Sequence, residues 1–183
     1  MIIVSTAVMA DRYVVDSPSK DISAVIRLAG GSASSTILFK GEPVLRESRM
    51  GLVMGDGTDL SEELTVLKDS RTGVDRTWVQ PWGETREVVE RYNELQLELA
   101  PGKSSEPALV IVFRVFDDGV GFRYELPGAG EFTVRDDRTE FALVSDYRSW
   151  WIPAFENNRY EYLYTESAAS GLQTAHTPLT MET

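Results

Sequence analysis

Two stretches of the chain combine aromatic rings with carboxylates and amides. Residues 74–94 read VDRTWVQPWGETREVVERYNE, and residues 150–166 read WWIPAFENNRYEYLYTE. Aromatic faces stack on the apolar C–H faces of sugar rings, and planar oxygen acceptors bind sugar hydroxyl groups. We therefore predict a carbohydrate-binding surface with Trp150, Trp151 and Tyr160 as its platform. The competing interpretation, which the residues leave open, is that these tryptophans belong to the core of a β-sandwich.

Other reactive groups give weaker indications of chemistry. A glycosidase needs two carboxylic acids that flank the scissile bond, but sequence order does not show which acids meet in space. Residues 56–63 (DGTDLSEE) are acidic but lack the alternating ligand positions of an EF-hand, so we interpret them as a solvated turn. His176 is the only histidine and no G-x-S-x-G motif is present, so we expect a structural role for it.

The elements that must position these residues are strands, because the hydrophobic pattern has a period of two. In residues 92–99 (YNELQLEL) the three leucines share one face and the polar residues share the other, which predicts a half-buried antiparallel strand. Residues 109–116 (LVIVFRVF) are apolar on both faces except at Arg114, which predicts a strand in the middle of a sandwich.

A hairpin is expected directly after this central strand. The Asp-Gly pair at 118–119 separates two alternating runs, which is a strong signal for a two-residue turn. Such a turn would place Val115 opposite Phe122 and Arg114 opposite Arg123. Two facing arginines would need an acidic neighbour.

Short strands separated by turn residues complete an all-β, antiparallel β-sandwich. Helix is expected at most as one turn within residues 60–67, and the Pro- and Ser-containing residues 101–107 are expected to form a hairpin loop rather than a domain boundary. The weaker predicted strands are residues 12–15, 22–28, 35–39, 64–69, 87–91, 131–135 and 140–144.

Composition excludes several classes of protein. The 183 residues carry a net charge of −11, which repels phosphate backbones, so we expect no nucleic-acid partner. Without cysteine there is no disulfide and no thiolate zinc site. No apolar run approaches the roughly 20 residues that span a bilayer, so we expect no membrane span.

The N-terminus allows two interpretations. Residues 1–10 (MIIVSTAVMA) are apolar and end in small residues, like the tail of a secretory signal peptide, but they lack its basic region. If a leader was lost from the start, the protein is periplasmic or secreted. If these residues are instead a short first strand, it is cytoplasmic.

Several long segments together carry a resemblance to a known family. They are VDRTWVQPWGETREVVERYNEL at 74–95, FRVFDDGVGFRYELP at 113–127, TEF at 139–141, and WWIP followed by YEYLYTE at 160–166. In this order they resemble the N-terminal domain of glycoside hydrolase family 97, and the similarity extends over nearly the whole chain after Asp16. Residues 17–20, 41–45 and 177–183 look similar too.

The resemblance implies a fold and a context. The family's enzymes are α-glucosidases and α-galactosidases, mostly exported by bacteria, with an N-terminal super-sandwich similar to galactose mutarotase, a catalytic (β/α)₈ barrel and a small C-terminal β domain. It implies an N-terminal segment at 1–16 and a β-sandwich domain at 17–183 that is cut off before the barrel and incomplete at its C-terminal edge. The catalytic acids would lie on the barrel, so we expect the chain alone to be inactive.

The resemblance also implies a metal ligand. The family depends on calcium, and its N-terminal domain lends the active site one glutamate from the segment after W-I-P. On this chain that residue is Glu161, with Glu156 as the reserve candidate. The partners implied are the barrel and an oligosaccharide substrate. A free-standing carbohydrate-binding module, and an interaction protein with no sugar role, are the alternatives.

Overall fold

The computed structural model describes residues 10–128, 130–155 and 161–182. These residues divide into two compact units, one ending at Ala142 and the other beginning at Leu143, and each is described by itself. The leader-like residues 1–9 lie outside the described residues. In the part of the chain that is described, no helix is long and apolar enough to cross a membrane.

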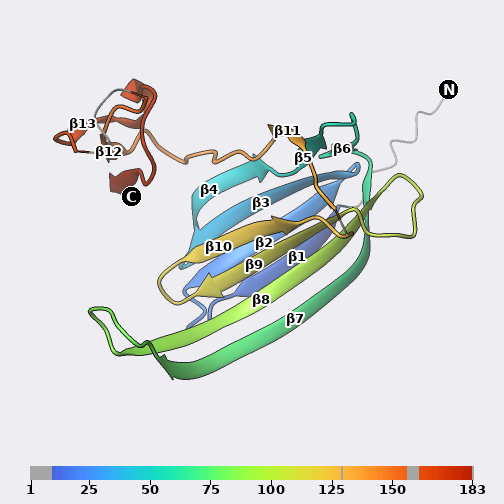
Figure 1. Ribbon diagram of the computed structural model, residues 1–183, viewed down its shortest axis with the longest axis horizontal. Helices are drawn as coiled ribbons and strands as arrows, with labels where there is room; N and C mark the ends of the chain where they lie inside the picture. The colour runs from blue at the N-terminus through green and yellow to red at the C-terminus, as the bar shows by residue number, and fades with distance from the viewer. Residues whose placement is uncertain (1–9, 129, 156–160, 183) are drawn as a thin grey trace. The chain divides into compact units, whose positions relative to one another are not determined.

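The first unit begins with an antiparallel meander of four strands, in the order β1-β2-β3-β4 (Figure 1). The strands are β1 (Asp11–Asp16), β2 (Ile22–Ala29), β3 (Ser32–Phe39) and β4 (Glu42–Arg49). The first three confirm the strands predicted from alternation. The fourth was not predicted, because its charged residues and Pro43 hide the period-two pattern.

A second four-stranded sheet has the order β10-β9-β8-β7. Its strands are β7 (Leu64–Val79), β8 (Glu87–Pro101), β9 (Leu109–Phe116) and β10 (Val120–Glu125). Residues 101–107 connect β8 to β9 as the expected hairpin loop. The helical turn that the sequence left open for residues 60–67 does not form, because Leu60 and Leu64 enter the sandwich core from the strands β6 (Asp59–Leu60) and β7.

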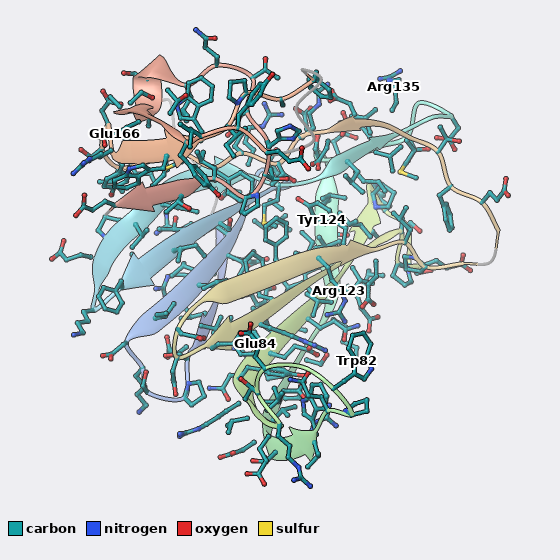
Figure 2. All side chains as sticks on the ribbon, turned by 60° about the vertical axis from the view of Figure 1, so that its left-hand side comes forward. Trp82, Glu84, Arg123, Tyr124, Arg135 and Glu166 are labelled. Atoms are coloured by element: carbon teal, nitrogen blue, oxygen red, sulfur yellow. The ribbon has the colours of Figure 1, made fainter. Side chains whose placement is uncertain are left out.

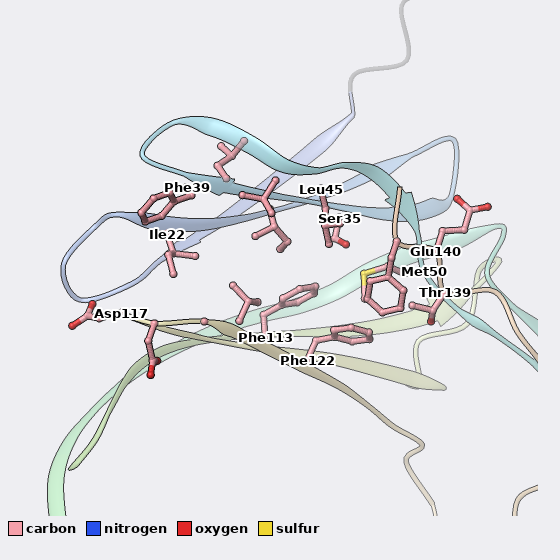
Figure 3. Close-up of a pocket in the computed structure, with 17 residues that line it drawn as sticks. Ile22, Ser35, Phe39, Leu45, Met50, Phe113, Asp117, Phe122, Thr139 and Glu140 are labelled. Carbon is pink, nitrogen blue, oxygen red and sulfur yellow. The ribbon is translucent and has the colours of Figure 1, made fainter. Parts of the chain in front are cut away.

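These two sheets form the layers of a sandwich (Figure 3). Leu95, Leu97 and Leu99 of β8 are at most 2% exposed and share the core with residues of β1, β2 and β3, as the alternation predicts. On β9 the outward-facing Val110 and Val112 are buried as well, which confirms it as a central strand. The other core residues of the two sheets include Val15, Ala24, Ile26, Ala33, Leu109, Ile111, Phe113 and Val115.

The hairpin between β9 and β10 exists, but its predicted register is wrong. Gly121, not Arg123, lies opposite Arg114. The turn has Asp117 and Asp118 at its centre, and the Phe116 N–H donates to the Gly119 carbonyl at 2.8 Å. Glycine therefore occupies the last position of the turn rather than its centre, as in a type I turn.

Two side-chain contacts account for this register. Asp117 Oδ1 accepts a hydrogen bond from the backbone N–H of Ser19 at 2.7 Å, which holds the turn against the β1–β2 loop. The shift also separates the two arginines: Arg114 pairs with Glu94 of β8 and Arg123 with Glu125, each at 2.6 Å. Both guanidinium groups thus have a carboxylate partner.

A small third sheet completes the first unit, in the order β11-β5-β6. It contains β5 (Leu52–Met54), β6 (Asp59–Leu60) and β11 (Val134–Asp137), so the strand predicted at 131–135 begins later. Residues 140–144 do not form the predicted strand. The Ala142 N–H bonds to the Ser48 hydroxyl at 2.9 Å instead of to a backbone carbonyl, which interrupts a regular ladder beside β4.

The second unit is built on three short strands, in the order β13-β12-β14. They are β12 (Arg148–Trp151), β13 (Thr165–Ala168) and β14 (Thr180–Glu182), and a short 3-10 helix, η1 (Ala169–Gly171), follows β13. The central strand β12 carries two of the predicted platform residues, so its register with β13 and β14 decides what surrounds them.

Candidate functional site

The two tryptophans of β12 point to opposite faces of their small sheet, because strand side chains alternate. Trp151 is 5% exposed, and its indole N–H donates to Ser167 Oγ of β13 at 3.0 Å. Trp150 is half-buried on the other face. Of the two rings, that of Trp150 is the more exposed.

A charged cluster surrounds Trp150. The Arg148 guanidinium lies 4.9 Å from the Trp150 ring centroid, which is a cation–π contact. Arg148 Nε also pairs with Glu166 Oε1 of β13 at 2.7 Å, and its Nη1 lies 3.8 Å from Glu182 Oε2 of β14. We call Arg148, Trp150, Glu166 and Glu182 the Trp150 cluster; Glu166 is labelled in Figure 2.

Arg148 controls the charge state of this cluster. Its hydrogen bond and positive charge lower the pKa of Glu166, and the two carboxylates in turn raise the pKa of Arg148. Glu166 is therefore an ionised acceptor at neutral pH. Aromatic rings, carboxylate acceptors and guanidinium donors are the groups that contact polyhydroxylated rings, and here Arg148 itself lies against the Trp150 ring.

The other predicted site residues are placed less completely. Tyr160 and the reserve candidate Glu156 lie outside the described residues. Glu161 is described and exposed, between those residues and β13. Its carboxylate suits a hard cation such as calcium, but the described residues contain no group of three or more His, Cys, Asp or Glu that could hold a metal.

The first aromatic cluster lies in the other unit. The paired ends of β7 and β8 extend past the last residue of β9, and we call residues 75–91 the β7–β8 arm (Figure 1). Trp78 on this arm is 44% exposed, and Trp82 at its tip is 86% exposed (Figure 2). Arg76 pairs with Glu90 across the arm at 2.6 Å.

Two weaker candidates lie in turns and connecting segments. In the acidic turn, Asp56 Oδ1 accepts from the Thr58 N–H at 2.9 Å, and Asp59 Oδ1 accepts from the Ser61 N–H at 2.8 Å. Such local bonds stabilise the turn itself. The backbone N–H of His176 donates to the Ile152 carbonyl at 2.9 Å, which joins the segment after β12 to the segment before β14. This bond does not involve the imidazole, so the structural role expected for the side chain stays a prediction.

Sequence reasoning missed Arg148, Glu166 and Glu182. The alternation R-S-W at 148–150 was a usable signal, because it places Arg148 beside Trp150 on one strand face. The two glutamates gave no such signal, since their positions depend on how β13 and β14 align with β12.

Comparisons with known proteins agree with this architecture. The family model described as Glycosyl-hydrolase 97 N-terminal matches residues 15–183. A glycoside hydrolase family 97 enzyme from Pseudoalteromonas sp. strain K8, solved with panose, superposes with a TM-score of 0.85 and 31% identity, over 93% of this chain and 26% of that one. The same figures hold for its complex with acarbose.

More distant relatives share the fold. A β-arabinopyranosidase superposes with a TM-score of 0.71 and 24% identity, over 84% of this chain and 26% of that one. A retaining α-galactosidase of Bacteroides thetaiotaomicron is 24% identical over 135 residues, which are 74% of this chain and 19% of the enzyme. The chain thus spans at most about a quarter of the length of these relatives. With a family match over residues 15–183, it belongs to the glycosyl-hydrolase 97 N-terminal family.

Proposed function

We propose that this chain is the non-catalytic N-terminal domain of a calcium-dependent α-glycosidase that hydrolyses α-glucosides or α-galactosides. It would pack on a catalytic (β/α)₈ barrel and lend that barrel Glu161 as a calcium ligand. The observation that carries the proposal is the coverage: the domain aligns over 93% of its length with only 26% of a family 97 enzyme. The names of the relatives, a retaining α-galactosidase and an enzyme complexed with panose, support the substrate class.

Glu161 supplies one ligand at most. Calcium takes about six to eight oxygen ligands, so a single exposed carboxylate must be joined by ligands from elsewhere. We therefore expect the isolated chain to bind calcium weakly, and a longer enzyme to bind it with Glu161 in place. When bound, the ion would polarise an oxygen of the substrate or of a water molecule.

The decisive experiment assays the purified chain with aryl α-glucoside and aryl α-galactoside in the presence of calcium. We expect no turnover, and clear turnover that follows the protein through purification would overturn the proposal. In the longer enzyme, Glu161→Gln should raise the calcium concentration needed for half-maximal activity. The matched variant Glu62→Gln, an exposed glutamate of the first unit, should leave that concentration unchanged.

A free-standing carbohydrate-binding module is the second candidate, and the Trp150 cluster favours it. Tryptophan fluorescence of the chain, titrated with maltose, melibiose or panose, separates the two functions. A saturable change that is lost in Trp150→Phe but kept in Trp82→Phe would favour the module. No change with any of the three sugars would count against the module. The calcium response of the Glu161→Gln variant then separates the enzyme domain from an interaction protein with no sugar role.

A further inference from the structure

The strand β13 begins at Thr165, shortly after Glu161 in the chain. Residues 161–164 are all exposed, so burial does not fix the position of this segment. Its far end is fixed where the chain enters the sheet, because Thr165 pairs with Trp151 of β12. The position of the Glu161 carboxylate therefore depends on how firmly β13 is held on β12.

The two strands share a packed face at this point. Thr165 lies directly opposite Trp151, and Ser167 lies opposite Ser149. Because strand side chains alternate, these four side chains point to the same face of the small sheet. Trp151 is 5% exposed and Ser149 is fully buried, so this face is shielded from water.

A side-chain hydrogen bond joins the two strands on this face. The indole N–H of Trp151 donates to Ser167 Oγ at 3.0 Å, and Ser167 Oγ donates in turn to the Ala168 carbonyl at 2.9 Å. The hydroxyl group thus acts both as acceptor and as donor, which fixes its orientation. Because the Trp151 ring is buried, removal of the acceptor would leave the indole donor unpaired, which is costly.

Contacts that do not involve β13 hold β12 in place. The strand β14 pairs with the first three residues of β12. Beyond β12, the backbone N–H of Ala154 donates to the Thr174 carbonyl at 2.9 Å. The backbone N–H of His176 donates to the Ile152 carbonyl at the same distance. Trp151 therefore lies in a segment that is fixed on both sides of it, and all of these contacts lie within the second unit.

The opposite face of the sheet offers a weaker attachment for β13. The side chains of Arg148 and Glu166, which form the ion pair there, are 56% and 52% exposed. Exposed ion pairs contribute little to stability, because water and salt screen them. The buried bond between Trp151 and Ser167 is therefore the stronger side-chain attachment of β13.

We propose that Trp151 is a positioning residue for Glu161. Through Ser167 it fixes β13, and β13 fixes the segment that carries the calcium ligand. The inference rests on the proposed function, in which Glu161 is that ligand. A ligand whose position is fixed in advance binds a metal more tightly, because less freedom is lost when the ion binds. Trp151 thus acts from within the unit, and its buried ring does not need to contact a sugar.

Calcium titration calorimetry of the longer enzyme tests the proposal. Ser167→Ala removes the acceptor and should weaken calcium binding by about tenfold, the lower end of what changes around a metal ligand cost. Trp151→Phe removes the donor of the same bond and should have a similar effect. Ser167→Thr keeps the hydroxyl group and should bind calcium as the unaltered enzyme does. The matched control is Ser23→Ala, which removes a hydroxyl bonded to Asp16 Oδ1 at 2.6 Å in the first unit and should leave the affinity unchanged.

A double variant separates positioning from a general loss of stability. If Ser167 acts through Glu161, Ser167→Ala should weaken calcium binding no further once Glu161→Gln is present. In the calcium-free enzyme, Ser167→Ala should also accelerate amide exchange in β13. An unchanged affinity in Ser167→Ala would overturn the proposal, and so would a loss of the same size with and without the Glu161 carboxylate.

The same titrations distinguish this inference from the proposed function. If Glu161→Gln leaves the calcium affinity unchanged, Glu161 is not a ligand and both proposals fail. If Glu161→Gln weakens binding and Ser167→Ala does not, the ligand role stands and the positioning role of Trp151 is wrong.

Discussion

The hydroxyl group of Tyr124 connects β10 to the third sheet through a chain of hydrogen bonds. The Gly51 N–H donates to Tyr124 Oη at 3.0 Å, and Tyr124 Oη lies 2.7 Å from Thr139 Oγ1. Thr139 donates its own proton to Asp137 Oδ1 at 2.6 Å, so Tyr124 must be the donor to Thr139. Replacing Tyr124 with phenylalanine keeps the ring and removes both bonds of its hydroxyl.

The expected cost follows from the surroundings of Gly51. This residue is buried, and its backbone is packed so closely that an added Cβ would lie 2.5 Å from the Leu60 carbonyl oxygen. Its N–H has little room to find another acceptor, and a buried donor left without a partner costs about 1–3 kcal/mol. We expect Tyr124→Phe to lower the free energy of unfolding by about 2 kcal/mol, which for a chain of this size lowers Tm by about 4–8 °C.

Urea denaturation followed by circular dichroism measures this loss, and faster amide exchange at Gly51 locates it. The matched control is Tyr13→Phe, a half-buried tyrosine of the same unit whose hydroxyl has no hydrogen bond within the described residues. The control should lose less than about 0.5 kcal/mol, because it leaves no buried donor unpaired. Equal stability of the two variants, or unchanged exchange at Gly51, would refute the reasoning.

The same tyrosine predicts a response to alkaline pH. Burial raises the pKa of Tyr124 above its usual value of 10.0, so the folded state favours the neutral phenol. The stability that this group contributes is complete below the unfolded pKa and is lost as pH rises through the folded pKa. Tyr124→Phe should therefore flatten the fall in stability above about pH 10, the reference value for an unperturbed tyrosine.

Three shorter predictions test other parts of the fold. Gly51→Ala should lower the free energy of unfolding by more than about 2 kcal/mol, because φ is +132° and the added Cβ would clash with a backbone oxygen. Gly41→Ala also has a positive φ, +86°, but its Cβ would enter open space, so it should cost less. Thermal unfolding of the two variants compares these costs. The hydrogen bond from the Ser19 N–H lowers the pKa of Asp117 in the folded state. The stability that this carboxylate contributes is therefore present above its unfolded pKa and is lost as pH falls through its folded pKa. Asp117→Asn should make the loss of stability at acidic pH less steep. Trp151→Phe removes a buried indole and its bond to β13, so amide exchange in β13 should accelerate while β8 is unaffected.

Alternation alone determined the class of fold and its central strands. Residues 92–99 and 109–116 were predicted as strands with the correct buried faces, because a period-two pattern is a local property of the chain. The family was also recognisable from the order of long segments, and the match over residues 15–183 confirms it. The strand β4 was not predicted, since its burial comes from its neighbours rather than from its own pattern.

Tertiary structure decided the register and the surroundings of the candidate residues. The Asp-Gly pair indicated a turn at 118–119, but the strands align one residue earlier, with Asp117 and Asp118 at the centre of the turn. This alignment goes with the hydrogen bond between Asp117 and Ser19, which are 98 residues apart in the sequence. The Trp150 cluster likewise depends on β13 and β14 pairing with β12 at particular positions. Period-two patterning shows which face of a strand is buried, but it carries no information on which residue of another strand lies opposite. Only long-range contacts between side chains and backbone select that alignment, and the alignment places Arg148 between two glutamates beside Trp150.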